Sequence, residues 1–347
     1  MCIGGVVAVR VLSVAWECPF EPYGGLGVFL SRLLPEMAAE HSVVHYCMHG
    51  FFRAVHPVDF HGVRVVRVHE PLIDSGGGLL NLSSIALAGK LLYVVSLFDS
   101  LLAHDVHAAL TVLIAREFGV RSGYYVHMFT YHPLDIAGVI AADSVIANSR
   151  LTAKQIQGVI RGSDVEVVYP ASPYPPVNEP SSFEDGTPVV LIPSRFQDNK
   201  SPQHVLKALE DARRRVEFRV VVFGRGSELY KLPEWVEVRG TVGEGEKLEL
   251  YRRAYVTLQV GFPEPFGLVA LESISQGTPV LTSNQSGVSE VLPGESTYTI
   301  ENLAEKLVQI LSNPHEREEL WYKQRESWIM RRTWKDVWRE IENTLIR

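Results

Sequence analysis

Cysteine is scarce in this chain of 347 residues, which contains only Cys2, Cys18 and Cys47. None of the three belongs to a Cys-x-x-Cys pair, and an odd number at scattered positions does not predict a disulfide framework. We therefore expect the cysteines to form no such framework. A reducing, cytoplasmic location is the simplest interpretation.

Long hydrophobic runs are also missing. The apolar N-terminus, residues 1–16, lacks a basic leader region and a cleavage signature, so we interpret it as a first β-strand. The longest apolar stretch, residues 76–98, is interrupted by Lys90 and by several serines and glycines. This composition predicts a packed helix rather than a transmembrane span, and membrane association is not indicated.

Positive charge does not dominate, because 33 Lys and Arg stand against 40 Asp and Glu, a formal net charge of −7. Binding to nucleic acid depends on clustered Lys and Arg that release counterions from phosphates. The balance therefore argues against a nucleic-acid partner. It also disfavours electrostatic docking on an anionic membrane.

Recognisable metal-binding patterns are few. His41, His45 and His49 are spaced by four residues, but they lie around a predicted strand rather than on one helix. No carboxylate accompanies them in that pattern, so we predict no metal site here. The role of the three histidines is left open.

What the chain does have is a regular alternation of short Val, Ile and Leu runs with helical patterns, the signature of parallel sheets built from βαβ units. Strands are predicted near residues 6–15, 43–47, 63–68, 99–103, 123–127, 144–147, 165–168, 188–193, 218–223, 235–239, 255–260 and 279–282. Helices are predicted at 28–40, 107–117, 150–160, 201–213, 244–253 and 267–276, and from residue 302 onward.

The alternation stops between residues 169 and 188, in a segment rich in Pro, Ser and acidic residues that is typical of a linker. We predict an N-terminal domain at 1–170, a linker at 171–187, a C-terminal domain at 188–330, and a helix at 331–347 that packs back on the N-terminal domain. The apolar stripe of this helix contains Trp334, Val337, Ile341 and Leu345. The predicted fold class is α/β, with two Rossmann-like doubly wound domains facing a central cleft.

The most informative stretch is GFPEPFGLVALE at residues 261–272, which is followed by GTPV at 277–280. It leads from a predicted strand through a Gly/Pro loop into a helix, with Glu264 in the loop and Glu272 on the helix. The amides of residues 266–268 lie at the helix start, where unpaired N–H groups and the helix dipole suit a phosphate. Each carboxylate can hold paired hydroxyls of the kind that a sugar or a ribose presents.

Two further segments follow predicted strands in the C-terminal half. Arg195 and Lys200 come after the strand at 188–193 and can converge on one diphosphate, as a guanidinium fork and a point charge. Gly224 and Gly226 flank a single arginine after the strand at 218–223, a pattern that by itself predicts only a tight turn.

Together these segments resemble the retaining GT-B glycosyltransferases of group 1, whose motif is Glu-x7-Glu. The resemblance implies that Glu264 contacts the donor sugar and that Glu272 binds the ribose hydroxyls. It implies further donor contacts from Arg195, Lys200, Gly224, Phe266, Gly267 and Leu268, with Arg195 and Lys200 on the diphosphate. Gly287 and Glu290 match a structural turn of the family.

The loop WECPFEPYGGLG at residues 16–27 joins the predicted first strand to the first helix. It resembles the glycogen and starch synthase branch of the family, in which GlyGlyLeu follows the first strand over the donor diphosphate. The resemblance therefore implies donor contacts from Gly25, Leu26 and Gly27. Pro22 stands where bacterial members of that branch carry a lysine, so one positive contact is missing.

Several histidines of the N-terminal half follow predicted strands. His104 and Asp105 resemble the His-Asp pair of the same synthases, and His127 falls where the family places a histidine beside the donor sugar. We count His127 with Glu264, Arg195 and Lys200 as catalytic. His104, Asp105, His132 and Ser149 are candidates for contact with the acceptor or the sugar.

The chain has no Asp-x-Asp, the carboxylate pair with which the other large glycosyltransferase fold holds its metal and diphosphate. Arg195, Lys200 and the helix start can stabilise the leaving group without a cation. We therefore predict a metal-independent enzyme that needs no cofactor beyond its co-substrate, a nucleoside diphospho-sugar.

The predicted function is transfer of a hexose, glucose in the first place, from UDP-glucose or ADP-glucose to a glycan acceptor with retained configuration, as in glycogen and starch synthases. The chain is shorter than usual for glycogen synthases, so a transferase to a small sugar, a lipid or another non-glucan acceptor is a rival interpretation. An inactive sugar-nucleotide-binding subunit is a further alternative. The sequence leaves the nucleotide, the sugar and the oligomeric state open.

Overall fold

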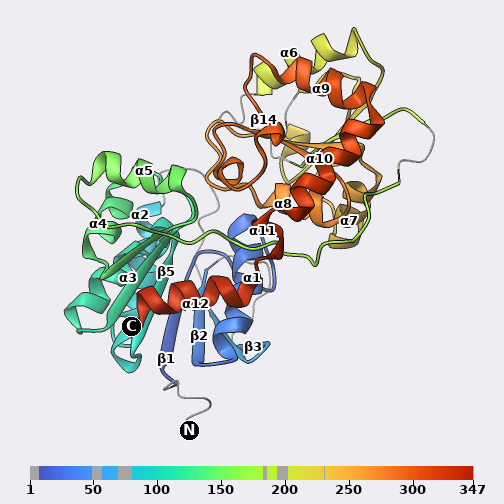
Figure 1. The fold of residues 1–347 in the computed structure, drawn as a ribbon. Helices are drawn as coiled ribbons and strands as arrows, with labels where there is room; N and C mark the ends of the chain where they lie inside the picture. Colours follow the sequence, from blue (N-terminus) through green and yellow to red (C-terminus); the bar gives the residue numbers. More distant parts are fainter. Residues whose placement is uncertain are drawn as a thin grey trace. The chain divides into compact units, whose positions relative to one another are not determined.

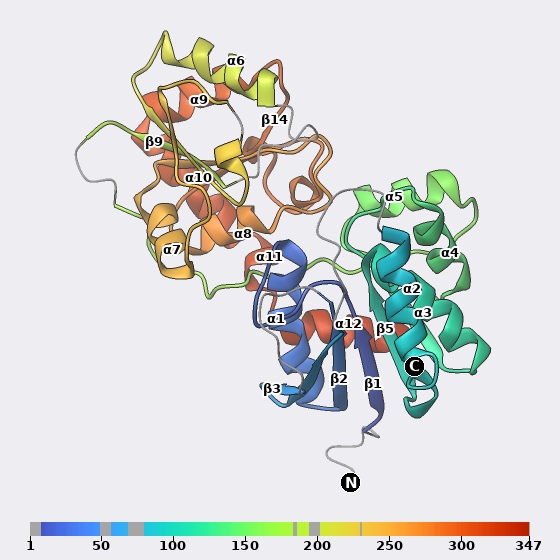
Figure 2. The ribbon, with the colours of Figure 1, turned by 180° about the vertical axis from the view of Figure 1, so that it is seen from behind.

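A computed structural model of the chain describes residues 8–48, 57–68, 80–182, 186–193, 202–229 and 231–346. The chain divides into two compact units (Figures 1 and 2). Unit 1 comprises Met1–Pro170 together with Thr333–Arg347, and unit 2 comprises Ala171–Arg332. Each unit is built around its own parallel sheet.

The sheet of unit 1 has the strand order β3-β4-β2-β1-β5-β6-β7-β8. Its strands are β1 (Arg10–Val14), β2 (Ser42–Cys47), β3 (Val58–Phe60), β4 (Val63–Arg67), β5 (Ser100–His104), β6 (Arg121–Val126), β7 (Ser144–Ala147) and β8 (Glu166–Val167). The pairs are parallel except for β3 with β4 at the edge. Because β1 lies between β2 and β5, the strand order reverses there, which is where doubly wound sheets place ligands.

Helices cover both faces of this sheet. They are α1 (Gly25–Ala38), α2 (Leu80–Leu91), α3 (Asp105–Glu117), α4 (Pro133–Ala141), α5 (Arg150–Val159) and α12 (Trp334–Leu345), with a short turn η1 (Val95–Leu97). Side chains that alternate along the strands, such as Leu12, Leu101 and Tyr124, pack in one core with those of α2 to α5. In Figure 2, α2 and α3 lie in front of the strands and α12 lies behind them.

Helix α12 returns to unit 1 from the far end of the chain. A capping box between Thr333 and Asp336 starts the helix by satisfying amides at its first turn. The predicted stripe of Trp334, Val337, Ile341 and Leu345 is buried against unit 1. A Cβ on Gly123 of β6 would lie 3.0 Å from Leu345 Cδ1, so the glycine makes room for the helix.

The sheet of unit 2 has the order β11-β10-β9-β12-β13-β14, with every pair parallel. Its strands are β9 (Val189–Pro193), β10 (Arg219–Phe223), β11 (Val236–Val238), β12 (Val256–Gln259), β13 (Val280–Ser283) and β14 (Thr297–Tyr298). The helices are α6 (Pro202–Arg213), α7 (Glu244–Arg253), α8 (Leu268–Ser275), α9 (Leu303–Ser312), α10 (Pro314–Glu326) and α11 (Trp328–Arg331), with short turns η3 (Ser227–Leu229), η4 (Gly287–Glu290) and η5 (Gly294–Ser296). The strand order reverses between β9 and β12.

The α/β fold with two Rossmann-like sheets is confirmed, and each predicted strand has a counterpart within a few residues. The edge strands β3 and β14 and the helix α4 are additions to the prediction. Among the described residues, no helix is long and apolar enough to cross a bilayer.

The expectation about cysteine was wrong. Cys18 and Cys47 form a disulfide, with their Cα atoms 5.3 Å apart. The spacing of the cysteines did not predict this bond, because residues 18 and 47 become neighbours only when β1 and β2 pair. The argument from cysteine for a reducing location is therefore removed.

Candidate functional site

In unit 2, the predicted site residues lie in loops that follow parallel strands. The loop after β12 carries Glu264, and the turn after β10 carries Gly224. Since the carboxyl ends of parallel strands share one edge of the sheet, these loops lie on the same side of unit 2. Arg195 and Lys200 follow β9, the strand at the reversal point, but both lie outside the described residues.

The loop that carries Glu264 is clamped to the next loop of the sheet. The Glu264 amide donates to the Gln285 carbonyl at 2.9 Å, and the Gly287 amide donates to the Glu264 carbonyl at 3.0 Å. The Ser286 hydroxyl donates to the Phe266 carbonyl at 2.9 Å. These bonds hold both ends of the loop, so the backbone that presents the Glu264 carboxylate is defined before any ligand binds.

Gly267 caps the N-terminus of α8 in a left-handed conformation, with φ of +99°. A Cβ at this position would lie 3.2 Å from Ser286 Oγ and 3.3 Å from Gln259 Cδ, so both the backbone and the packing select glycine. The first amides of α8 have no acceptor within the helix, and the helix dipole is positive at this end. The α8 start can therefore receive an anion.

Glu272 lies on α8 and is only 5% exposed. Its carboxylate accepts a hydrogen bond from the Tyr251 hydroxyl at 2.8 Å and pairs with Lys247 Nζ at 3.5 Å. Burial lowers the pKa of Lys247, but Glu272, Tyr174 and Glu244 together raise it above its ordinary value. Burial and the Glu272 charge raise the pKa of Tyr251. The carboxylate is thus held within a polar cluster, and the ribose contact implied by the resemblance stays a prediction.

Gly224 follows β10 directly with φ of +141°, and its amide donates to the Gly240 carbonyl at 2.7 Å. The Ser227 amide then donates back to the Gly224 carbonyl at 3.1 Å. This is the tight turn that the sequence predicts. The turn η4 covers Gly287 and Glu290, as expected for a structural turn.

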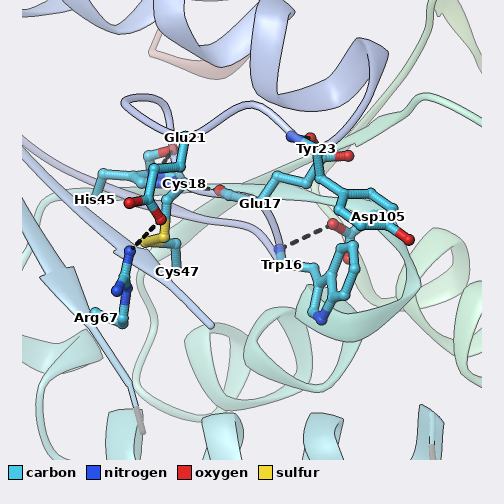
Figure 3. The surroundings of a disulfide bond; sticks show 10 residues. Trp16, Glu17, Cys18, Glu21, Tyr23, His45, Cys47, Arg67 and Asp105 are labelled. Atoms are coloured by element: carbon cyan, nitrogen blue, oxygen red, sulfur yellow. Dashed lines mark hydrogen bonds and ion pairs between the residues drawn. A yellow bond between two sulfur atoms is a disulfide. The ribbon is translucent and has the colours of Figure 1, made fainter. Parts of the chain in front are cut away.

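In unit 1, the Gly-rich loop after β1 is organised around Glu17, which the sequence analysis did not assign a role (Figure 3). Glu17 is 6% exposed, and its Oε2 accepts hydrogen bonds from the amides of Tyr23 at 2.9 Å, Gly24 at 2.8 Å and Gly27 at 2.8 Å. Burial raises the pKa of Glu17 although the three amides oppose this shift. The carboxylate of the chain itself occupies part of the anion site at the start of α1.

Because of these bonds to Glu17, the three glycine-loop residues predicted to contact the donor differ in whether their amides are available to a ligand. The Gly27 amide is directed to Glu17, so it is not offered to a ligand in this structure. Gly25 and Leu26 occupy the first two positions of α1, where the helix provides no acceptor for their amides. Within the described residues, no hydrogen bond engages those two amides, and they stay candidates for the diphosphate.

The disulfide and His45 anchor the same loop. Cys18 follows Glu17 directly, and its bond to Cys47 ties the loop to the end of β2. His45 lies on β2, contacts Ser13 Oγ through Nδ1 at 2.9 Å, and reaches the Glu17 carbonyl through Nε2 at 3.3 Å. Burial lowers the pKa of His45 to about 4. A neutral imidazole on β2 therefore contacts the loop at Glu17 (Figure 3).

His104 and His127 follow neighbouring strands and contact each other, with His104 Nδ1 and His127 Nε2 separated by 3.2 Å. Burial lowers the pKa of His127 to about 3, and burial together with His127 and His45 lowers the pKa of His104 well below its ordinary value. His104 is fully buried in this structure, and the contact with acceptor or sugar implied by the resemblance stays a prediction. His127 follows the carboxyl end of β6 and is half-buried.

Asp105 begins α3 in a left-handed conformation, with φ of +68°, which is uncommon for a residue with a side chain. Its Oδ2 accepts from the Trp16 amide at 3.0 Å, and its Oδ1 accepts from the His107 amide at 2.8 Å. Asp105 therefore joins the loop after β1 to the start of α3 (Figure 3).

The other two candidates of unit 1 cap helices. His132 is the N-cap of α4, where its Nδ1 accepts from the Leu134 amide at 3.2 Å. Ser149 is the N-cap of α5, accepts from the Thr152 amide at 3.0 Å, and is fully buried. The acceptor or sugar contacts predicted for Ser149 and His132 stay predictions.

The histidines spaced by four residues do not share a site among the described residues. His41 Nε2 contacts Glu342 Oε1 of α12 at 3.0 Å, and Glu40 lies close enough to complete a group of three potential ligands. However, His41 Nδ1 accepts from the Val9 amide at 3.3 Å, which leaves the proton on Nε2 and directs it to Glu342. His45 supports the loop after β1, and His49 lies outside the described residues.

Comparison with known proteins identifies the architecture that carries these loops. Residues 177–327, which contain the Glu264 loop and α8, match the family described as Glycosyl transferases group 1. These residues therefore form a group 1 glycosyltransferase domain. In unit 2, the glycosyltransferase domain thus spans β9 to α10 and includes the reversal point of the sheet.

Curated relatives match this chain over different lengths. Glycogen synthase of Mycobacterium tuberculosis is 24% identical over 359 aligned residues, which cover 88% of this chain and 87% of that protein. D-inositol 3-phosphate glycosyltransferase of Nocardia farcinica is 27% identical over 187 residues, 46% of this chain and 41% of that protein. This chain therefore spans less than half of the second relative in that match.

Solved structures share the fold of this chain over nearly its full length. Sucrose-phosphate synthase from Thermosynechococcus elongatus aligns with a TM-score of 0.81 at 18% identity and covers 96% of this chain and 97% of its own. Anabaena HepE, solved in complex with UDP and glucose, aligns with a TM-score of 0.73 at 17% identity, covering 97% and 99%. At these identities the likeness establishes the GT-B fold.

Proposed function

We propose that this glycosyltransferase moves a hexose, glucose in the first place, from a nucleoside diphospho-sugar to a glycan acceptor with retained configuration. The observation that carries the proposal is the clamped loop of unit 2, which joins Glu264 to the anion-accepting start of α8 through Gly267. A carboxylate for sugar hydroxyls and a helix N-terminus for phosphate are the two features that a sugar diphosphate needs side by side.

In this proposal unit 2 binds the donor. The diphosphate is held by the amides that begin α8, by Arg195 and by Lys200, with the last two assigned from their sequence positions after β9. Glu264 binds the hexose, and Glu272 binds the ribose by exchanging its contacts with Tyr251 and Lys247 for the paired hydroxyls. Gly224 lines the nucleotide pocket.

Bond cleavage places positive charge on the sugar ring and negative charge on the departing diphosphate. Arg195, Lys200 and the α8 amides stabilise the negative charge, so the proposal needs no metal ion and no cofactor besides the co-substrate. We found no carboxylate of unit 1 to assign as a covalent nucleophile. A front-face substitution, in which the departing phosphate takes the proton of the acceptor hydroxyl, accounts for retention.

The acceptor is proposed to bind unit 1. A glucan is favoured because the match to a glycogen synthase extends over 88% of this chain. A small phosphorylated polyol or sugar is the second candidate, because a relative named D-inositol 3-phosphate glycosyltransferase matches 46% of the chain. Labelled donors offered with glucan, with small sugars and with inositol phosphate distinguish the two.

The decisive experiment combines a donor panel with Glu264→Gln. Purified protein is assayed with uridine, adenosine and guanosine diphosphoglucose, and binding is followed separately by thermal shift. We expect Glu264→Gln to bind the nucleoside diphosphate as the wild type does but to lose a factor of about 10²–10³ in kcat, the range found when one transition-state contact is removed.

Glu249→Gln is the matched control, because Glu249 lies on the exposed side of α7 in an ion pair with Arg253. Its kcat should stay within a factor of two of the wild type, about 0.4 kcal/mol. Donor binding without sugar transfer to any acceptor, and unaffected by Glu264→Gln, would instead identify a sugar-nucleotide-binding subunit.

A further inference from the structure

His104 is a buried histidine whose side chain has one hydrogen-bonding contact among the described residues, the ring of His127. It ends β5, has no exposed surface, and places Nδ1 at 3.2 Å from His127 Nε2. The rings of Phe29 and Tyr125 lie 6.1 and 6.0 Å from its ring centre. No ligand can reach His104 in this position, so any influence on a bound sugar passes through His127.

The two imidazoles together hold two protons when both are neutral. Burial lowers the pKa of His127 to about 3, and burial also lowers the pKa of His104. His45, the other titratable group that acts on His104, has a pKa lowered to about 4. The Asp105 charge raises the pKa of His127 but does not outweigh burial. Near neutral pH each ring therefore carries one proton, on one of its two nitrogens.

The buried Nε2 of His104 decides where those protons lie. Within the described part of the chain, this atom has no hydrogen-bond partner. If His127 donated to His104 Nδ1, the proton of His104 would sit on Nε2 as a buried N–H without an acceptor, which native structures rarely contain. If His104 donates through Nδ1, only a lone pair is left at Nε2.

We infer that His104 is a positioning residue that donates its Nδ1–H to His127 Nε2 and thereby keeps the proton of His127 on Nδ1. The nitrogen that a histidine protonates is set by the bond that its other nitrogen makes. His127 then presents Nδ1 as a hydrogen-bond donor, and no group of the described chain uses that atom.

The surroundings keep this donor in one orientation. The His127 carbonyl accepts from Asn148 Nδ2 at 2.7 Å, which fixes the backbone. The rings of Tyr125 and Phe29 lie 4.5 and 4.6 Å from the His127 ring centre and limit its rotation. A fixed N–H suits an oxygen of the transferred sugar, a use that rests on the proposed function.

The tautomer itself is measured without any substrate. In wild-type protein labelled with ¹⁵N-histidine, long-range ¹H–¹⁵N correlation spectra near pH 7 report which nitrogen of each imidazole is protonated. We expect His127 to carry its proton on Nδ1 and to have an unprotonated Nε2. A His127 protonated on Nε2 would overturn the inference.

A matched pair of variants tests whether His104 is the cause. Asn places an amide N–H close to the position of Nδ1, whereas Leu has a similar shape and no donor. We expect His104→Asn to preserve the Nδ1–H form of His127 and His104→Leu to shift it to the Nε2–H form. His315 lies exposed on α10, so His315→Gln is the control substitution. It assigns the His315 signal in the spectrum and should leave the tautomers of His104 and His127 unchanged.

Transfer assays on the same variants follow the effect to the reaction. We expect His104→Leu to lower kcat by about 10–100-fold, the range found when the partner that orients a metal-ligating histidine is removed, with a much smaller change in KM for the donor. His104→Asn should restore most of the rate. An unchanged His127 tautomer in folded His104→Leu would overturn the inference, and if that variant does not fold, the wild-type spectrum decides. A wild type that transfers no sugar refutes the proposed function and leaves the tautomer measurement valid.

Discussion

Gly267 combines a left-handed backbone with close neighbours, so its replacement is expected to have two costs. Gly267→Ala forces a side chain into φ of +99° and places Cβ 3.2 Å from Ser286 Oγ. We expect a loss of about 1–2 kcal/mol in the free energy of unfolding of unit 2. Urea unfolding followed by fluorescence measures this change.

Gly245→Ala is the matched control for that substitution. Gly245 lies within α7, and a Cβ there would meet no atom within 4 Å. Alanine is favoured over glycine by about 0.5–1 kcal/mol in a helix interior, and Gly245 lies in the first turn of α7, so this variant should be at least as stable as the wild type. Equal effects of the two substitutions would show that the conformation of Gly267 is not a constraint.

Glu17 is the buried carboxylate whose titration should be visible in stability. Burial raises its pKa in the folded chain above the ordinary 4.5, so the folded state binds the proton more tightly than the unfolded state. Its stabilising contribution is complete below the unfolded-state pKa and is lost as pH rises through the raised value. The free energy of unfolding of wild type minus Glu17→Gln should therefore decrease between pH 4 and pH 7.

Urea unfolding at several pH values measures whether this difference in the free energy of unfolding decreases as pH rises. Glu249→Gln, which removes an exposed carboxylate, is the control. A difference that grows with pH would mean that the amides of Tyr23, Gly24 and Gly27 stabilise the ionised carboxylate by more than burial opposes it.

The disulfide joins two elements of unit 1, the loop after β1 and strand β2, across a sequence separation of 29 residues. Closing a loop of that length restricts the unfolded chain and is worth about 3–4 kcal/mol in the chain-entropy model. We expect Cys18→Ala with Cys47→Ala to lower the stability of unit 1 by that order. Thiol titration of denatured protein should find one free thiol before reduction and three after it; three free thiols without reduction would contradict the bond.

Helix α4 shows why some elements were missed. The stretch from His127 to Pro133 looks irregular, and the prediction treated it as a loop without seeing the helix that follows. Its start was nevertheless marked by Pro133 at the first helical position, which proline favours. Asp135 then ties the helix to the loop by accepting from the Thr130 amide at 2.8 Å and from the Tyr124 hydroxyl. That tie involves β6 and is not a local sequence signal.

At the scale of the whole chain, unit 1 includes the C-terminal residues of the chain, which pack into its core as helix α12. Trp338 of α12 is fully buried against unit 1, whereas Trp328 of α11 is half exposed and belongs to unit 2. We expect Trp338→Ala to destabilise unit 1 by about 3–5 kcal/mol, as for other large buried side chains, and Trp328→Ala to have a much smaller effect. Differential scanning calorimetry resolves the loss if the two units melt separately. A similar loss in both variants would contradict the assignment of α12 to the core of unit 1.

The periodicity of the sequence determined the α/β class and most strands, because a buried parallel strand needs a short run of β-branched and aliphatic residues wherever it occurs. The Glu264 loop and the start of α8 were predicted for the same kind of reason, since their glycines, prolines and carboxylates are adjacent along the chain. Only the tertiary structure decided that Glu17 accepts from amides of the Gly-rich loop, that Cys18 bonds Cys47, and that the His104 ring contacts the His127 ring. These contacts join residues that strand pairing and burial bring together. The strength of each contact depends on how far water is excluded around it, and the local sequence pattern does not contain that information.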